Sequence, residues 1–197
     1  MQKDLFDTLE AAFESLDERA SIAAAATLCE RMLHNYRLYC EVSGQGNRRQ
    51  IDSSMALVWE KLLAPAAKIN FELQAEKLLP LEAELEELLE GGDTSLGVQM
   101  ACDAIMALGI CLEAAVGKRP GAVVELSRLS RGEVEEMALL RGEQSEEAQA
   151  LQLDEQEFQS EIMELLKEQG AVKQTIQALK RLGANDGVSN LGLALEE

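Results

Sequence analysis

The sequence predicts an all-α protein that folds as one domain, a bundle of about eight helices. Apolar side chains recur at spacings of three and four residues along most of the chain, as on one face of an α-helix. Proline occurs three times and aromatic residues make up 4% of the chain, whereas alanine, leucine and glutamate, which favour helices, are abundant. We find no internal repeat and no strand pattern of sufficient length. A single domain over residues 1–197 is therefore expected.

Two helices are predicted at the start of the chain. The first carries five apolar residues on one face: Leu5, Phe6, Leu9, Phe13 and Leu16. The second covers about residues 21–43 and begins with an alanine-rich turn. It ends at Gly44 and Gly46, because glycine readily adopts the positive φ with which many helices stop.

Three further helical segments are predicted up to residue 90. One spans about residues 48–64 and ends before Pro65. The segment 65–79 is expected to continue helically. Pro80 suits the first turn of a new helix and begins the acidic segment up to residue 90.

The segment 96–116 is the most apolar of the predicted helices. At 100° per residue, its polar residues Gln99, Asp103 and Glu113 fall within a sector about 80° wide. A helix with so narrow a polar face belongs in the middle of a bundle.

Three helices are predicted in the last part of the chain. One follows a Lys-Arg-Pro-Gly break and ends near residue 141, with Gly132 marking a kink or a short turn. Residues 143–168 hold nine acidic residues against one lysine but keep an apolar face, which predicts a solvated outer helix. The last helix covers about residues 172–182, and residues 183–197 are expected to form a loop-rich tail.

The charge of the chain excludes several classes of partner. Its 18 Lys and Arg face 36 Asp and Glu, a net charge of -18. Such an excess of carboxylates repels nucleic-acid phosphates and anionic lipid, so neither a nucleic acid nor a membrane is expected as a partner. The N-terminal segment lacks the apolar core of a secretory signal, and the most apolar stretch is too short to span a bilayer. We therefore expect a cytoplasmic protein whose four cysteines are reduced.

Candidates for metal binding or catalysis are few. The single histidine, His34, shares a helix face with Glu30 and Glu41, but Arg37 lies in the same sector and competes with a metal cation. The four cysteines cannot pair within their own helices and are expected to be small buried apolar residues. We find no nucleophile elbow, phosphate loop or calcium loop. The sequence predicts no catalytic residue, metal ligand or cofactor, and an enzyme is the less favoured class.

Several short strings are informative when taken together and in order. They are residues 28–36 (LCERMLHNY), 39–40 (YC), 58–60 (VWE), 68–77 (KINFELQAEK), 103–104 (DA) and 189–192 (SNLG). From about residue 28 to 193 the chain resembles the YjaG-like family of small bacterial proteins, whose function is not characterised. The resemblance implies an all-helical, single-domain cytoplasmic protein. Leu33-His34 replaces an aromatic-proline pair of the family and Glu72 replaces an Asp, so the resemblance gives His34 no catalytic or metal-binding role.

The matched strings supply eight polar candidate site residues: Glu30, Arg31, Asn35, Lys68, Asn70, Asp103, Ser189 and Asn190. The favoured interpretation is structural, since Asn side chains cap helices and Glu–Arg pairs orient helix faces. In the other interpretation some of them converge on a groove with Tyr36 and Trp59 as aromatic walls.

The sequence favours a protein-interaction module that binds another protein, or a second copy of itself as a homodimer, through an apolar helix face. The surplus of apolar helix residues and the lack of an assembled catalytic set suggest this class. The alternative is a small-molecule-binding protein or enzyme with a groove near Tyr36, Trp59 and Asn70. The high net charge favours solubility and opposes the homodimer.

Overall fold

The computed structural model describes residues 2–93 and 95–194, with side chains from Phe6 onwards, so the side chain of Leu5 and the end of the predicted tail lie outside the described part. Within these ranges the chain forms helices and loops without a strand, which confirms the all-α prediction. The helices are α1 (Gln2–Glu14), α2 (Glu18–Ser43), α3 (Arg48–Leu63), α4 (Phe71–Glu76), α5 (Leu79–Glu90), α6 (Leu96–Ala114), α7 (Ala122–Leu140), α8 (Glu146–Gln169), α9 (Lys173–Ala184) and the 3-10 helix η1 (Asn185–Gly187).

The central element is α2, which contacts α3, α6, α7, α8 and α9. It begins after Asp17, whose carboxylate accepts the N–H of Ala20 at 2.8 Å, and ends at Gly44 in the left-handed conformation. The four consecutive alanines 23–26 are all fully buried. Because their side chains are small, neighbouring helices can approach α2 closely.

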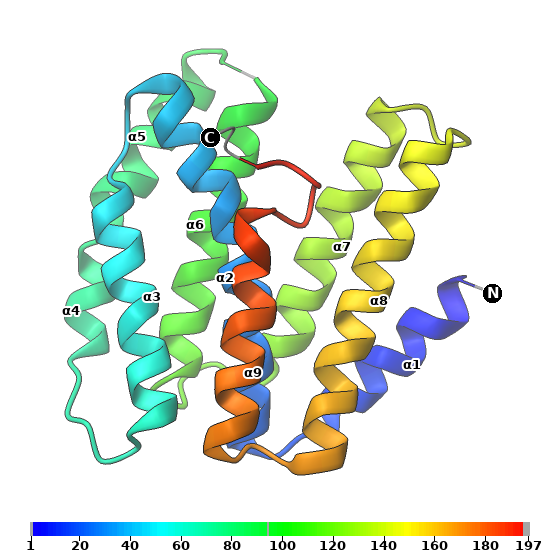
Figure 1. Cartoon of the computed structure of the whole chain (residues 1–197). Helices are drawn as coiled ribbons and strands as arrows, with labels where there is room; N and C mark the ends of the chain where they lie inside the picture. Colours follow the sequence, from blue (N-terminus) through cyan, green and yellow to red (C-terminus); the bar gives the residue numbers. More distant parts are fainter. Residues whose placement is uncertain (1, 94, 195–197) are drawn as a thin grey trace.

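The other helices surround α2 on all sides (Figure 1). On one side lie α3, α4 and α5, and on the other α7 and α8, with α1 packed across the last two. The main apolar core draws residues from every helix from α1 to α9. A second, smaller core consists of Met100, Val134, Met137, Leu151 and Leu191. In it, the segment after α9 fills the space between α6 and the α7–α8 pair (Figure 1).

The apolar helix α6 packs most extensively on α2, as its narrow polar face predicts. Among the residues that the structure describes, α6 is the one helix long and apolar enough to cross a membrane, yet 56% of its most apolar stretch is buried inside the bundle. Such burial is typical of the core helix of a soluble protein. Met106 nevertheless falls in the sector predicted to be polar and is 51% exposed.

Three details of the predicted helices are wrong. Residues 65–70 are not helical: α3 ends before Pro65, and the Lys61 ammonium bonds the carbonyl of Pro65 at 2.7 Å, which stabilises the turn. Gly132 causes no kink, since α7 runs through it. The predicted loop-rich tail begins too early, because α9 continues through Gly183 and η1 follows it.

Gly183 marks the closest approach of α9 to α2. A Cβ added there would lie 2.8 Å from the backbone oxygen of Thr27, so Gly183→Ala should force the two helices apart. We expect the free energy of unfolding to fall by about 1–3 kcal/mol in urea titrations. Gly132→Ala is the matched control. A Cβ added at Gly132 meets nothing within 4 Å, so the free energy of unfolding of this variant should rise by about 0.5–1 kcal/mol through helix propensity. A Gly183→Ala variant as stable as Gly132→Ala would contradict this packing.

Candidate functional site

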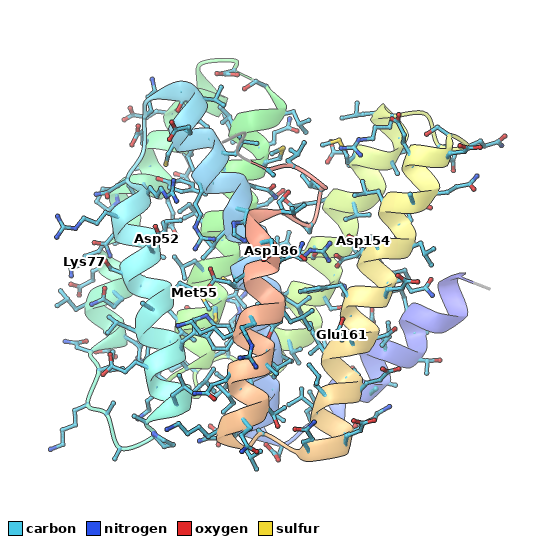
Figure 2. All side chains as sticks on the ribbon, viewed as in Figure 1. Asp52, Met55, Lys77, Asp154, Glu161 and Asp186 are labelled. Atoms are coloured by element: carbon cyan, nitrogen blue, oxygen red, sulfur yellow. The ribbon has the colours of Figure 1, made fainter. Side chains whose placement is uncertain are left out.

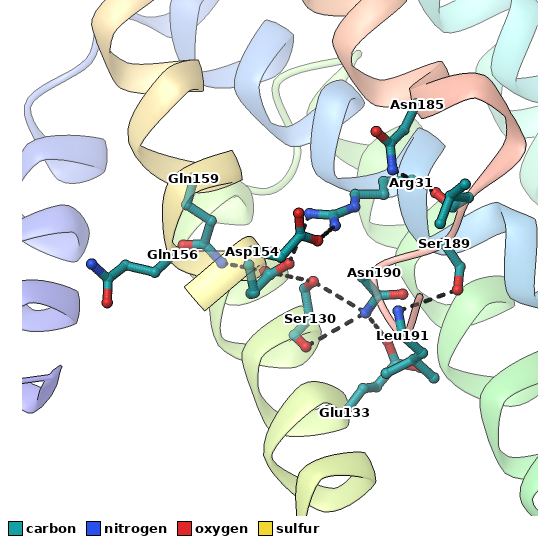
Figure 3. Close-up of polar contacts among 12 residues, drawn as sticks. Arg31, Ser130, Glu133, Asp154, Gln156, Gln159, Asn185, Ser189, Asn190 and Leu191 are labelled. Atoms are coloured by element: carbon teal, nitrogen blue, oxygen red, sulfur yellow. Dashed lines mark hydrogen bonds and ion pairs between the residues drawn. The ribbon is translucent and has the colours of Figure 1, made fainter. Parts of the chain in front are cut away.

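Three of the predicted site residues meet in one buried cluster, here called the buried polar network (Figure 3). Its members come from α2, α7, α8 and the segment after α9: Arg31, Asn35, Ser127, Ser130, Glu133, Glu155, Gln159 and Asn190. Each is at most 7% exposed. So many buried polar side chains require mutual hydrogen bonds.

The ion pair of Arg31 and Glu155 links α2 to α8. The Arg31 Nη1 donates to Glu155 Oε2 at 3.2 Å, and its Nη2 pairs with Asp154. The other oxygen of Glu155 accepts the Ser130 hydroxyl at 2.8 Å and the Gln159 amide at 2.7 Å. Burial raises the pKa of the Glu155 carboxyl, and the Arg31 charge partly opposes that rise.

Asn190 ties the chain after α9 into the network. Its Nδ2 donates to Glu133 Oε2 at 2.7 Å, and its Oδ1 accepts the Asn35 amide at 3.0 Å. Ser189 folds this segment locally, since its hydroxyl accepts the N–H groups of Leu191 and Leu193. These contacts fit the structural interpretation of the matched asparagines and of Ser189.

Glu133 is a second buried acid of the network. Burial raises its pKa to about 8, the amide of Asn190 opposes the rise, and the charge of Asp103 adds to it. Asp103 lies beside the network, and its own pKa is raised by burial and by Glu136. Among the residues that the structure describes, Glu133 Oε1, Asn35 Oδ1 and Arg31 Nε have no hydrogen-bond partner. A neutral Glu133 costs less to bury than a charged one.

A second polar cluster surrounds His34, where a cleft of about 620 Å³ opens between α2, α3 and α9. Arg37 bonds Glu30 at 2.7 Å and Asp52 at 2.8 Å, and Glu30 also accepts the indole N–H of Trp59 at 2.9 Å. His34 Nε2 donates to the carbonyl of residue 184 at 2.8 Å, so Nδ1 is left to accept from Arg37 at 3.1 Å. Burial and the Arg37 charge lower the pKa of His34, which keeps the ring neutral.

Neither cluster resembles a metal centre. Figure 2 shows Asp52 and Met55 on α3 and Asp186 after α9, all of which line the cleft beside His34. In the described ranges, no group of three or more His, Cys, Asp and Glu side chains is placed to hold a metal ion. The carboxylates near His34 are instead occupied by Arg37 and Trp59.

The structure does not bring Tyr36, Trp59 and Asn70 together. The Tyr36 hydroxyl accepts the backbone N–H of Asn47 at the start of α3, and Trp59 lies about 18 Å further along that helix. Asn70 is the exposed N-cap of α4, where its side chain accepts the N–H of Leu73 at 3.0 Å. Lys68 lies exposed in the loop before α4, so neither it nor Asn70 joins the buried polar network.

A different surface, which the sequence analysis missed, combines a cavity with exposed apolar groups. This surface, here called the α6 groove, has a volume of about 410 Å³ and lies between α6 and the α4–α5 segment. It is lined by Phe71, Glu72, Ala75, Glu76, Leu78, Leu79, Glu82, Gly109, Leu112, Glu113, Val116 and Lys118. Two of its apolar side chains are well exposed, Leu79 by 58% and Val116 by 41%.

The rim of the α6 groove is acidic. Four carboxylates line it, those of Glu72, Glu76, Glu82 and Glu113. Glu72 pairs with Lys118 and Glu113 pairs with Arg119 at 2.7 Å, so the unbalanced negative charge is that of Glu76 and Glu82. Burial, with the charge of Glu86, raises the pKa of Glu82. The groove is thus apolar at its floor and negative at its edges.

A signal for this groove was present in the sequence. Gly109 interrupts the most apolar helix, where glycine costs about 1 kcal/mol relative to alanine. Met106 precedes it by one turn on the same face and is half exposed. A glycine and a half-exposed methionine in or beside the narrow polar sector of α6 differ from an ordinary solvated helix face.

Comparison with known proteins defines the family. A family model described as "Protein of unknown function (DUF416)" matches residues 8–194. The chain belongs to the DUF416 family. It is 31% identical over 194 residues to an uncharacterized protein of Haemophilus influenzae, and 30% identical over 196 residues to the uncharacterized protein YjaG of Escherichia coli. Both alignments cover 93% of this chain and 95% of the relative, which confirms the predicted YjaG-like resemblance.

The DUF416 fold is also known from experiment. The crystal structure of a DUF416 family protein from Shewanella baltica OS155 matches this chain with a TM-score of 0.80 at 24% identity. The match covers 94% of this chain and 98% of that one. The helical arrangement described above is therefore that of a solved DUF416 protein.

Glu133 should make the stability of this DUF416 protein depend on pH. Its pKa is about 8 in the folded state against an ordinary value of 4.5, so folding takes up a proton between these values. The resulting stability is complete below about pH 4.5 and is lost as the pH rises towards 8. Glu133→Gln removes the cost of ionisation and should raise the free energy of unfolding by about 1–3 kcal/mol at pH 8, with a smaller gain at pH 5.

Urea titrations at both pH values would measure this effect. Glu157→Gln, at an exposed position of α8, is the matched control and should show little change. A gain for Glu133→Gln that is equal at pH 5 and pH 8 would contradict the assignment, because it could not come from the titration of this carboxyl.

Proposed function

We propose that the protein is a protein-interaction module, and that its α6 groove binds a basic amphipathic helix of a partner protein. The observation that carries the proposal is the apolar floor of the groove, where Leu79 is 58% and Val116 is 41% exposed. Exposed apolar groups gathered in one hollow, and rimmed by charge, are typical of protein-interaction sites. An amphipathic helix laid in such a groove buries its apolar face there.

Gly109 supports this use of the groove. A Cβ added at Gly109 would meet only the carboxylate of Glu82, at 3.9 Å, so packing within the chain does not require a glycine there. Glycine is nevertheless kept in the middle of α6 despite its low helix propensity. The missing side chain leaves room for a partner to approach the helix backbone.

The charge of the rim defines the chemistry of the partner. Lys118 and Arg119 balance two of its four carboxylates, and the excess charge of Glu76 and Glu82 favours a segment with lysine or arginine beside its apolar residues. The same rim disfavours a second copy of this chain, because two acidic grooves and two net charges of -18 repel each other. The partner is therefore proposed to be another protein. The proposed setting is the cytoplasm, where the four free cysteines would remain reduced.

Gly109→Leu tests the groove with little risk to the fold. The new side chain should fill the groove, and the fold should be as stable as before or gain up to about 1 kcal/mol from helix propensity. Binding of a synthetic helical peptide, with leucines at i, i+3, i+4 and i+7 and lysines beside them, should weaken at least tenfold in calorimetric titration. Gly132→Leu makes the same exchange at an open position of α7 and should leave binding unchanged.

Crosslinking in cells identifies the natural occupant. A photoreactive amino acid at position 106 should link to a segment of another protein that carries lysine or arginine beside apolar residues, and Gly109→Leu should abolish the link. Crosslinks to a second copy of the chain would replace the proposed partner with a homodimer. Peptide binding that Gly109→Leu and Gly132→Leu weaken equally would remove the groove from the function altogether.

A further inference from the structure

One side of α6 stays open beyond the α6 groove, towards the start of that helix. Gly109 lines the groove, and Met106 and Asp103 precede it at steps of three residues, so the three positions form a row along the helix, here called the α6 stripe. Met106 lies in the middle of the stripe and is 51% exposed. An exposed apolar side chain therefore continues the apolar floor of the groove outside it.

Helices α5 and α7 border the α6 stripe. Gly109 faces α5, because a Cβ added there would lie 3.9 Å from the Glu82 carboxylate. Asp103 faces α7, because burial and the charge of Glu136 on that helix together raise the pKa of the Asp103 carboxyl. A partner helix that lies along the stripe would thus have α5 on one side and α7 on the other.

Carboxylates without a basic partner occur on both sides of the stripe. Glu82 and Glu86 lie about one turn apart on α5, and Asp103 on α6 is close to Glu136 on α7. In the described part of the chain, none of these four carboxylates forms an ion pair with a lysine or an arginine. The stripe therefore carries negative charge that the chain itself does not balance.

Glu133 distinguishes the Asp103 end of the stripe from an ordinary acidic surface. Its side chain is buried behind Asp103, at 7% exposure, and its Oε1 has no hydrogen-bond partner among the described residues. The charges of Asp103 and Glu136 both add to the burial that raises the pKa of Glu133, so the three carboxyls share one small region. A cation at the partly exposed Asp103 would offset this concentrated negative charge without having to reach Glu133.

We propose that Asp103 determines the specificity of the α6 groove by binding a lysine or arginine of the docked helix. This role of Asp103 rests on the proposed function, because the partner helix must first lie in the groove. Its apolar residues cover Leu79, Val116 and Met106, and its basic side chain reaches Asp103. Asp103 lies six residues from Gly109, about 9 Å along α6, so the basic residue should be about seven residues from the one that covers Gly109.

A double-mutant cycle tests the pair. The basic helical peptide that tests the groove, extended by two turns at each end, should bind Asp103→Asn about three- to tenfold more weakly than the unchanged protein in calorimetric titration. Norleucine in place of one lysine, about seven residues from the residue over Gly109, should cause a similar loss. The two changes together should weaken binding no more than either alone, because both remove the same interaction.

Glu157→Gln is the matched control. It removes the same charge from an exposed position on α8, away from the stripe, and should leave binding unchanged. Equal weakening by Asp103→Asn and Glu157→Gln would overturn the role of Asp103, because net charge alone would explain it. Binding that Gly109→Leu weakens and Asp103→Asn does not would also overturn this role, while the groove would stand. Binding that Gly109→Leu leaves unchanged would instead contradict the proposed function itself, and the role of Asp103 with it.

Discussion

Helix α2 packs against five other helices, and this packing determines where its charged side chains can lie. Its four buried alanines allow α6 to pack closely, and at Gly183 the backbone of α9 comes so near that even one Cβ would lie 2.8 Å from Thr27. On the side of α2 that faces α8, a charged side chain has little access to solvent. Arg31 lies there and is 2% exposed, so its charge must be balanced from inside the protein.

That requirement explains the buried polar network. An ion pair of this kind gains little net stability, because both charges lose their hydration, but an unpaired partner would cost several kcal/mol. We infer that the main effect of the network is to fix the positions of α7, α8 and the segment after α9 relative to α2. α8 must present Glu155 to Arg31, α7 must present Ser130 to Glu155, and the segment after α9 must present Asn190 to both α2 and α7. A shift of any of these elements by one residue would leave several buried polar groups unpaired.

The helices could be predicted well because the periodicity of their apolar residues is strong. The prediction failed where other interactions, local or between helices, outweigh this periodicity. The segment 65–70 continues the apolar pattern, yet Pro65 and the capping side chain of Asn70 end one helix and begin the next. The acidic residues of the segment 143–168 are exposed, as predicted, except Glu155, which is fully buried.

The candidate site was predicted only in part, for the same reason. Glu155 follows Leu151 by four residues and precedes Phe158 by three, so it lies on the apolar face of α8, and this spacing could have identified it. Arg31, Asn35 and Asn190 were found through a family resemblance, but their partners Ser130 and Glu133 lie outside the matched strings. The α6 groove involves three helices, and one helix pattern does not show which face its neighbours leave open.

Net charge alone would make this protein a weak and unselective binder of cations. At physiological ionic strength the field of exposed carboxylates decays over about 8 Å, so charge guides a partner over short distances and holds it loosely. Specific binding therefore needs apolar contact at the same place as the charge. The α6 groove combines an apolar floor with carboxylates on a scale that suits a helix. The same acidic surface that would attract such a partner repels a second copy of the chain, so the charge would select cationic partners and suppress self-association together.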